Sequence, residues 1–181
     1  MAVVESTKAF APAGTWTADP VHSNVSFEVG YAGVNTFRGS FREFAATLTG
    51  ESLEGSATVA SVDVKDEQLN GHLQTPDFFD AQRYPELTFR AAELVRHDDD
   101  TVTGNGELTI KGVTRQITFE GTIAPAPATD PFGRERIGLR LESTIDRTQF
   151  GVDWNAPNET GGDYLANDVK LFAELAFVKE S

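Results

Sequence analysis

At 181 residues, the chain is long enough for one domain with a substantial apolar core. Its 15 basic and 28 acidic side chains give a net charge of −13, which argues against binding to nucleic acid or to an anionic membrane surface. The chain has no cysteine, which excludes disulfides, thiolate metal sites and cysteine nucleophiles.

We expect no export signal in the first residues. The segment from Met1 to Gly14 has no basic start followed by a continuous apolar core, and no run of about 18 apolar residues occurs anywhere in the chain. We therefore expect a cytoplasmic protein without stable membrane insertion. Its predicted organisation is a flexible tail over residues 1–13 and one domain over residues 14–181.

Beyond the tail, apolar and polar residues alternate in most segments, which is the period of a strand with one buried face. The strands expected from this pattern are 15–19, 23–31, 37–48, 55–65, 86–96, 101–110, 113–124, 135–146 and 168–178. Within 37–48 the alternation shifts phase after Phe41, which indicates a β-bulge.

Between the fourth and fifth long strands the period changes. Asp66 is a suitable N-cap, and Leu69 and Leu73 lie four residues apart, so a short helix is expected here. The turn-rich segment that follows would lay Phe78, Phe79 and Tyr84 on an apolar surface.

A tight Lys111–Gly112 turn joins two strands with strict alternation. About eight antiparallel strands in sequence favour an all-β, up-and-down barrel with a short helical insertion, because closure removes exposed edges. An immunoglobulin-like sandwich remains the alternative, although the helical insertion and the absence of a Greek-key rhythm speak against it. Eight strands can enclose one slender ligand or be filled by side chains.

Polar residues with the spacing of a reactive site are scarce. Asp19, His22 and Ser23 suggest a nucleophilic triad, but adjacent residues of a strand point to opposite faces, so a structural role is expected. The three histidines lack metal-ligand spacing, and the acidic run 98–100 lacks the rest of a calcium loop and is expected to be a solvated turn. We therefore expect no catalytic residue, no metal and no cofactor.

Five motifs resemble those of the YceI-like family, in the same order and over nearly the whole chain. They are Asp19-Pro-Val-His-Ser-Asn-Val-Ser-Phe27, Leu73-Gln-Thr-Pro-Asp-Phe-Phe-Asp80, Tyr84-Pro-Glu-Leu-Thr-Phe89, Gly106-Glu-Leu-Thr-Ile-Lys-Gly-Val-Thr114 and Ile145-Asp-Arg-Thr-Gln-Phe-Gly151. The resemblance implies a lipocalin-like barrel with an apolar tunnel that binds polyisoprenoid lipids, such as isoprenoid quinones or polyprenyl phosphates. A homodimer is a further expectation from the resemblance.

Three positions depart from the family pattern. Relatives often carry a histidine at Tyr31, an Arg-Asp pair at Asn70-Gly71 and an acidic residue at Gln149. By resemblance, these changes would affect the preference for a headgroup and not the binding of a tail.

The inward faces of the strands supply the candidate wall of such a tunnel. The residues expected to contact lipid are Phe27, Val29, Tyr31, Phe89, Phe119, Leu139 and Leu141. Arg38, Arg42 and Arg115 lie near strand ends and could meet a phosphate, although solvation at the surface is the simpler interpretation.

The expected function is to carry or sequester an isoprenoid lipid, without enzymatic activity. Two alternatives stay open: a stress-related interaction protein whose barrel is filled by side chains, and an enzyme that acts on a bound hydrophobic substrate. If the tunnel exists, Leu141→Trp should plug it and abolish lipid retention.

Overall fold

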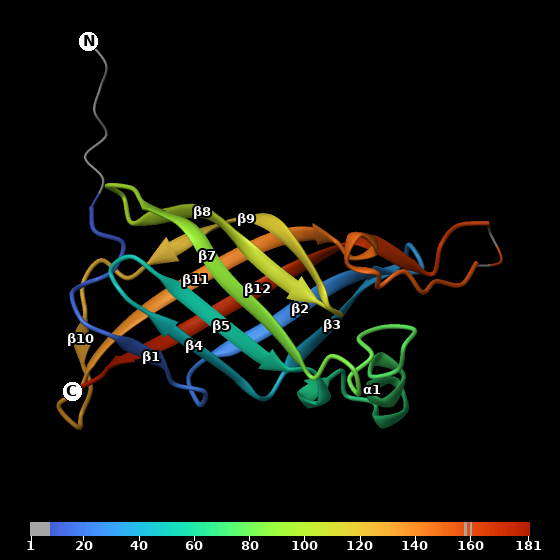
Figure 1. Cartoon of the computed structure of the whole chain (residues 1–181), viewed down its shortest axis with the longest axis horizontal. Helices are drawn as coiled ribbons and strands as arrows, with labels where there is room; N and C mark the ends of the chain where they lie inside the picture. Colours follow the sequence, from blue (N-terminus) through green and yellow to red (C-terminus); the bar gives the residue numbers. More distant parts are fainter. Residues whose placement is uncertain (1–7, 158, 160) are drawn as a thin grey trace, which may run out of the picture.

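The alternating segments form long antiparallel strands in the computed structural model, which describes residues 8–157, 159 and 161–181. The elements in chain order are β1 (Trp16–Ala18), β2 (Asn24–Tyr31), β3 (Asn35–Phe41), β4 (Phe44–Leu48), β5 (Leu53–Thr58), η1 (Val59–Ser61), β6 (Val62–Asp63), α1 (Glu67–Leu73), β7 (Glu86–Arg96), β8 (Thr101–Ile110), β9 (Val113–Ile123), β10 (Ala128–Thr129), β11 (Glu135–Asp146), η2 (Arg147–Phe150) and β12 (Leu165–Lys179). Figure 1 shows an elongated barrel with α1 at one end and the C-terminus at the other.

The strands close into a ring of eight, β1–β4–β5–β7–β8–β9–β11–β12, with β12 returning to β1 and every pairing antiparallel. This confirms the predicted barrel over the sandwich. Strand β12 has fifteen residues, of which Asp168 to Val178 pair with β11 on one side. On its other side, β12 pairs with β1 and then with β2.

Two of the expected strands are each divided in the structure. The predicted bulge within 37–48 is a bend at Arg42 and Glu43, so that β3 pairs with β2 and β6 while β4 pairs with β1 and β5. The expected strand 55–65 is likewise divided into β5 and β6 by η1, whose first residue, Val59, donates its amide to the Pro85 carbonyl. The strands thus follow one another along the chain as predicted, and the wall of the barrel bends at these two breaks.

The helix forms where the sequence predicts it. The Asp66 side chain accepts a hydrogen bond from the Leu69 amide, which caps the free amides of the first turn of α1. The segment after α1 returns to β7 across the same end of the barrel (Figure 1). Lys111 and Gly112 both have positive φ, as a two-residue hairpin turn requires, and the Tyr84 ring packs against Gly112.

The end of the barrel that holds the C-terminus, called the closed end below, is packed solid. Trp16, Leu48, Leu139 and Phe177 are fully buried there. They belong to one apolar cluster with Phe10, Ala11, Ala18, Ala46, Leu53, Val102, Ile123, Ile137 and Leu175.

Part of the expected tail belongs to this cluster. Residues 1–7 lie outside the described part of the chain, but Phe10 and Ala11 are only 3% and 2% exposed, and Lys8 forms a β-bridge with Arg96. The Trp16 indole also donates a hydrogen bond to the Pro12 carbonyl. Residues 8–13 therefore pack against the closed end, because two apolar side chains in this segment fill space that the strands leave.

Candidate lipid-binding cavities

The opposite end of the barrel is hollow. A cavity of about 480 Å³, called the mouth cavity below, lies between α1 and the walls of the barrel. Its wall is mostly apolar and includes Phe27, Val29 and Val169 from the strands and Leu69 and Leu73 from α1. This volume lies within the range of ordinary small-molecule sites.

A second cavity, called the inner cavity below, has a volume of about 180 Å³. It lies between the mouth cavity and the closed end, because Leu53 and Leu175 of the closed-end cluster form part of its wall. Phe89 and Phe119 contribute aromatic walls, with ring centroids 5.8 Å apart and nearly perpendicular planes. The interior of the barrel is therefore solid at one end and open at the other.

Six of the seven predicted wall residues border a cavity. Phe27, Val29 and Tyr31 line the mouth cavity, and Phe89, Phe119 and Leu141 line the inner cavity. Leu139 lines neither, since it is fully buried against Leu175 in the closed-end cluster. It lies one inward position closer to the closed end than Leu141, which is enough to move it from wall to core.

Glycines on neighbouring strands keep two of the aromatic rings close to the wall. Phe27 is paired with Gly39, and a Cβ on that glycine would collide with the Phe27 ring. Phe119 is paired with Gly104, where a Cβ would come within 2.6 Å of the ring. Because each ring occupies the space of a missing side chain, it covers the sheet without filling the barrel.

Two tyrosines stand at the mouth. The Tyr164 hydroxyl donates to the Tyr31 hydroxyl at 2.9 Å, and the rings meet edge to face with centroids 4.9 Å apart. This hydrogen bond, with desolvation, raises the pKa of Tyr164 above its usual value, so Tyr164 stays protonated as the donor. Both side chains line the mouth cavity.

A buried arginine fixes the loops around the mouth. Arg147 is 6% exposed and donates to the carbonyls of Ala166, Val152 and Trp154 at 2.8–2.9 Å. Burial lowers the pKa of the guanidinium, but arginine remains charged in proteins. Its contacts tie the segment after η2 to the start of β12, and it also borders the mouth cavity.

His72 completes the polar part of this wall. Its ring packs edge to face on Phe78 and Trp154, with centroids 5.0 and 5.1 Å away, and Nε2 lies 3.0 Å from Asp77 Oδ2. The sequence predicts no role for His72, because the three histidines lack metal-ligand spacing. Its position three residues after Leu69 could have placed it beside Leu69 on the inward face of the helix.

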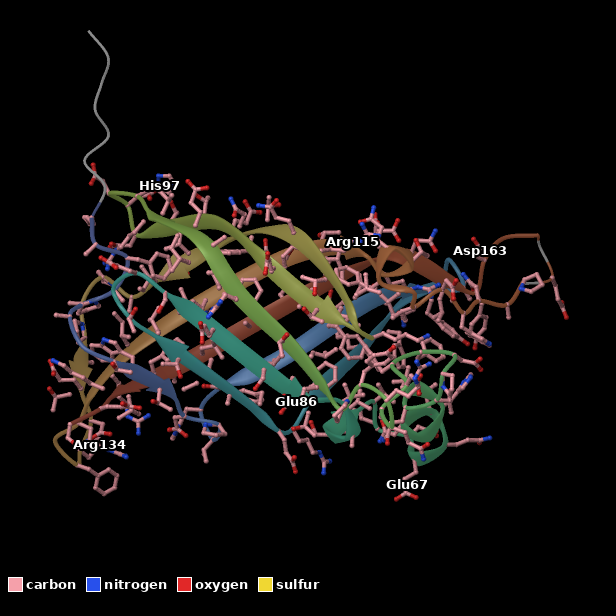
Figure 2. All side chains as sticks on the ribbon, in the orientation of Figure 1. Glu67, Glu86, His97, Arg115, Arg134 and Asp163 are labelled. Carbon is pink, nitrogen blue, oxygen red and sulfur yellow. The ribbon has the colours of Figure 1, made fainter. Side chains whose placement is uncertain are left out.

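The candidate phosphate-binding arginines lie elsewhere. Arg38 pairs with Glu28, Arg42 pairs with Asp63, and Arg115 donates to the Gln149 carbonyl; all three side chains are exposed and line neither cavity. Figure 2 places the labelled charged side chains around the outside of the barrel, including Glu67, Glu86, Arg115, Arg134 and Asp163.

The possible triad near the start of the chain has a structural arrangement. Asp19 binds His22 Nδ1, the Val21 amide and Arg136, while the Ser23 hydroxyl accepts from the Ala176 amide. These contacts hold the connection between β1 and β2 against β11 and β12.

No helix in the described part of the chain is both long and apolar enough to cross a membrane.

Comparison with known proteins identifies relatives over nearly the whole barrel. The family model of the YceI-like domain matches residues 16–177. A UPF0312 protein of Staphylococcus epidermidis is 31% identical over 166 residues, which cover 88% of this chain and 94% of that protein. A UPF0312 protein of Staphylococcus aureus is 31% identical over 172 residues, covering 90% and 96%.

Solved structures show the same architecture. BcnA of Burkholderia cenocepacia superposes with a TM-score of 0.71 at 24% identity, over 88% of this chain and 98% of that one. A YCEI protein of Campylobacter jejuni gives 0.68 at 26% identity, over 82% and 88%. A polyisoprenoid-binding domain from Saccharophagus degradans gives 0.69 at 13% identity, over 93% and 100%.

Proposed function

Because the chain belongs to the YceI-like family, we propose that it binds an isoprenoid lipid inside the barrel and carries or sequesters it without chemical change. The ligand class is an isoprenoid quinone or a polyprenyl phosphate. The observation that carries the proposal is the pair of apolar cavities between α1 and the closed end. The polyisoprenoid-binding domain from Saccharophagus degradans, which shares the fold, supports the ligand class.

The polarity of the walls gives the orientation of the bound lipid. Tyr31, Tyr164, His72 and Arg147 border only the mouth cavity, whereas the inner cavity ends against the apolar closed-end cluster. The headgroup therefore stays at the mouth and the tail points inward. Each methylene equivalent of tail that leaves water contributes about 0.8 kcal/mol, so the tail provides most of the affinity.

The titratable groups of the mouth favour binding over catalysis. Tyr31 and Tyr164 are hydrogen-bonded to each other, and Arg147 is occupied by backbone carbonyls. An enzyme would need two such groups converging on one substrate atom. The cavities also weigh against the alternative of a barrel filled by side chains.

Native mass spectrometry of the purified protein, with organic extraction of anything bound, tests the proposal. The wild type should retain a stoichiometric isoprenoid or bind added ubiquinone. Val169→Trp places an indole in the mouth cavity and should lower binding of added ubiquinone at least about tenfold, since many buried methylenes are displaced.

Lys170→Trp is the matched control, because this neighbour on β12 is exposed on the outer face. It should bind like the wild type. A wild-type protein with a clean apo mass that also fails to bind added ubiquinone would overturn the proposed function.

A further inference from the structure

Four apolar side chains form the boundary between the two cavities. Phe41, Leu87, Ile110 and Leu171 are the residues that line both. They come from β3, β7, β8 and β12, and so from several sides of the barrel. Phe41 and Ile110 are each only 6% exposed, while Leu87 and Leu171 are partly buried. These four side chains therefore mark the level at which the two cavities meet.

The residues of β12 show the order of the two cavities along the barrel. Leu165 and Val169 line only the mouth cavity, Leu171 lines both cavities, and Ala173 and Leu175 line only the inner one. At a rise of about 3.3 Å per residue, Leu171 and Leu175 lie about 13 Å apart along β12. This is enough to accommodate a further stretch of an extended hydrocarbon chain.

The neighbouring strand gives the same order. Ile145 of β11 lines the mouth cavity, Leu141 lines the inner cavity, and Leu139 lies in the closed-end cluster. Leu141 is paired with Ala173, and Leu139 with Leu175. The inner cavity is therefore bounded by the four shared residues on one side and by a solid floor on the other.

We propose that this boundary sorts ligands by the length of their apolar tail, an inference that rests on the proposed lipid-binding function. Short tails occupy the mouth cavity alone and gain nothing from the inner one. Longer tails pass between Phe41, Leu87, Ile110 and Leu171 and bury their terminal part against Phe89 and Phe119. The closed-end cluster then sets the longest tail that the barrel encloses completely.

The inner cavity also changes the expected effect of Leu141→Trp. Leu141 lies beyond the boundary, so the indole fills the inner cavity and leaves the mouth cavity open. The variant should shorten the preferred tail and not abolish binding altogether.

Binding of farnesol, geranylgeraniol and solanesol to the full chain, measured by native mass spectrometry in detergent, tests this inference. In the wild type, affinity should rise with tail length. In Leu141→Trp, solanesol should lose at least about tenfold in affinity while farnesol changes by less than about threefold, because only the longer tail reaches the inner cavity. Arg140→Trp, an exposed neighbour on β11, is the matched control and should keep the wild-type series.

Ala173→Leu fills the same cavity from the neighbouring strand β12 and serves as a second variant if Leu141→Trp does not fold. Equal losses for farnesol and solanesol in the folded variants would overturn the sorting inference and leave lipid binding intact. An unchanged series would overturn it as well. A wild type that binds none of the alcohols and no ubiquinone would remove the proposed function and this inference together.

Discussion

The closed end and the mouth of this barrel are built from the same alternating pattern but use their inward residues differently. At the closed end, Trp16 and Phe177 are fully buried within the apolar cluster. At the mouth, Phe27 and Phe79 are partly buried and border a cavity. Alternation therefore predicts which side chains point into the barrel. Whether these side chains form packed core or line a cavity depends on the residues across the barrel from them.

Charged contacts strengthen the same contrast. At the closed end, Arg136 donates to Asp19 Oδ2 at 2.8 Å and to Asp130 Oδ2 at 2.7 Å, joining three segments of chain. At the mouth, Lys111 donates to the carbonyls of Pro76 and Gly151, which connects the segment after α1 to the loop after η2. The closed end is thus held by an arginine between two carboxylates, and the mouth is held by Lys111 and Arg147 through backbone carbonyls.

The largest expected effect comes from truncating a ring at each end. Phe177→Ala should lower the free energy of unfolding by about 3–5 kcal/mol, since it leaves a void in close-packed surroundings. Phe27→Ala should cost roughly half as much, because its ring already borders open space. Urea denaturation of both variants measures the difference.

The contrast would be broken if the two variants were destabilised equally. That result would mean that the mouth is packed as tightly in solution as the closed end.

A medium effect is expected from the pH dependence of stability at the closed end. The Arg136 guanidinium holds the pKa values of Asp19 and Asp130 well below their usual range. The pKa of an aspartate in an unfolded chain is about 3.9, so the two ionised carboxylates contribute stability that is present above this pH and is lost as the pH falls toward their folded pKa values. Acidification below about pH 4 should therefore destabilise the protein.

Arg136→Met removes the cause of these low pKa values. Its Tm should lie below that of the wild type at neutral pH, and the gap should narrow on acidification to about pH 2. Thermal unfolding followed by circular dichroism measures both curves. A gap that stays constant with pH would show that Arg136 acts through packing alone.

The smallest effect on stability is expected from a change at Lys111. The same change should clearly affect how fast bound ligand exchanges. Lys111→Met keeps the aliphatic stem but loses the hydrogen bonds to Pro76 and Gly151. The segment after α1 and the loop after η2, called the mouth cover below, should therefore separate more often. Exchange of bound ubiquinone for an isotope-labelled form should speed up by up to about tenfold, with little change in Tm.

Lys179→Met is the matched control, because Lys179 pairs with Glu135 at the closed end. It should leave the exchange rate unchanged. Equal exchange rates in wild type and Lys111→Met would show that the ligand does not leave through the mouth cover.

Much of the barrel could be predicted from local patterns. Alternation located the long strands, Asp66 marked the start of α1, and the Lys111–Gly112 pair marked a hairpin turn. The division of residues 37–48 was visible as a phase shift, although its outcome, a bend that separates β3 from β4, depends on pairing with different neighbours.

The cavity residues were only partly predictable. Inward position alone selected Phe27 and Leu141, which line cavities, and also Leu139, which does not. Tyr164 and Trp154 were not selected, since they precede β12 in a segment without alternation. The carbonyl partners of Arg147 come from segments that meet only in the folded chain.

The sequence by itself determined the positions of the strands along the chain, the place of the helix and the face that each strand turns inward, because these depend on residues close together in the chain. Only the tertiary structure decided where the barrel is solid and where it is hollow. Packing across the interior depends on which side chains from distant strands meet: the chain near Phe10 fills one end, while Gly39 lets the Phe27 ring lie against the wall at the other.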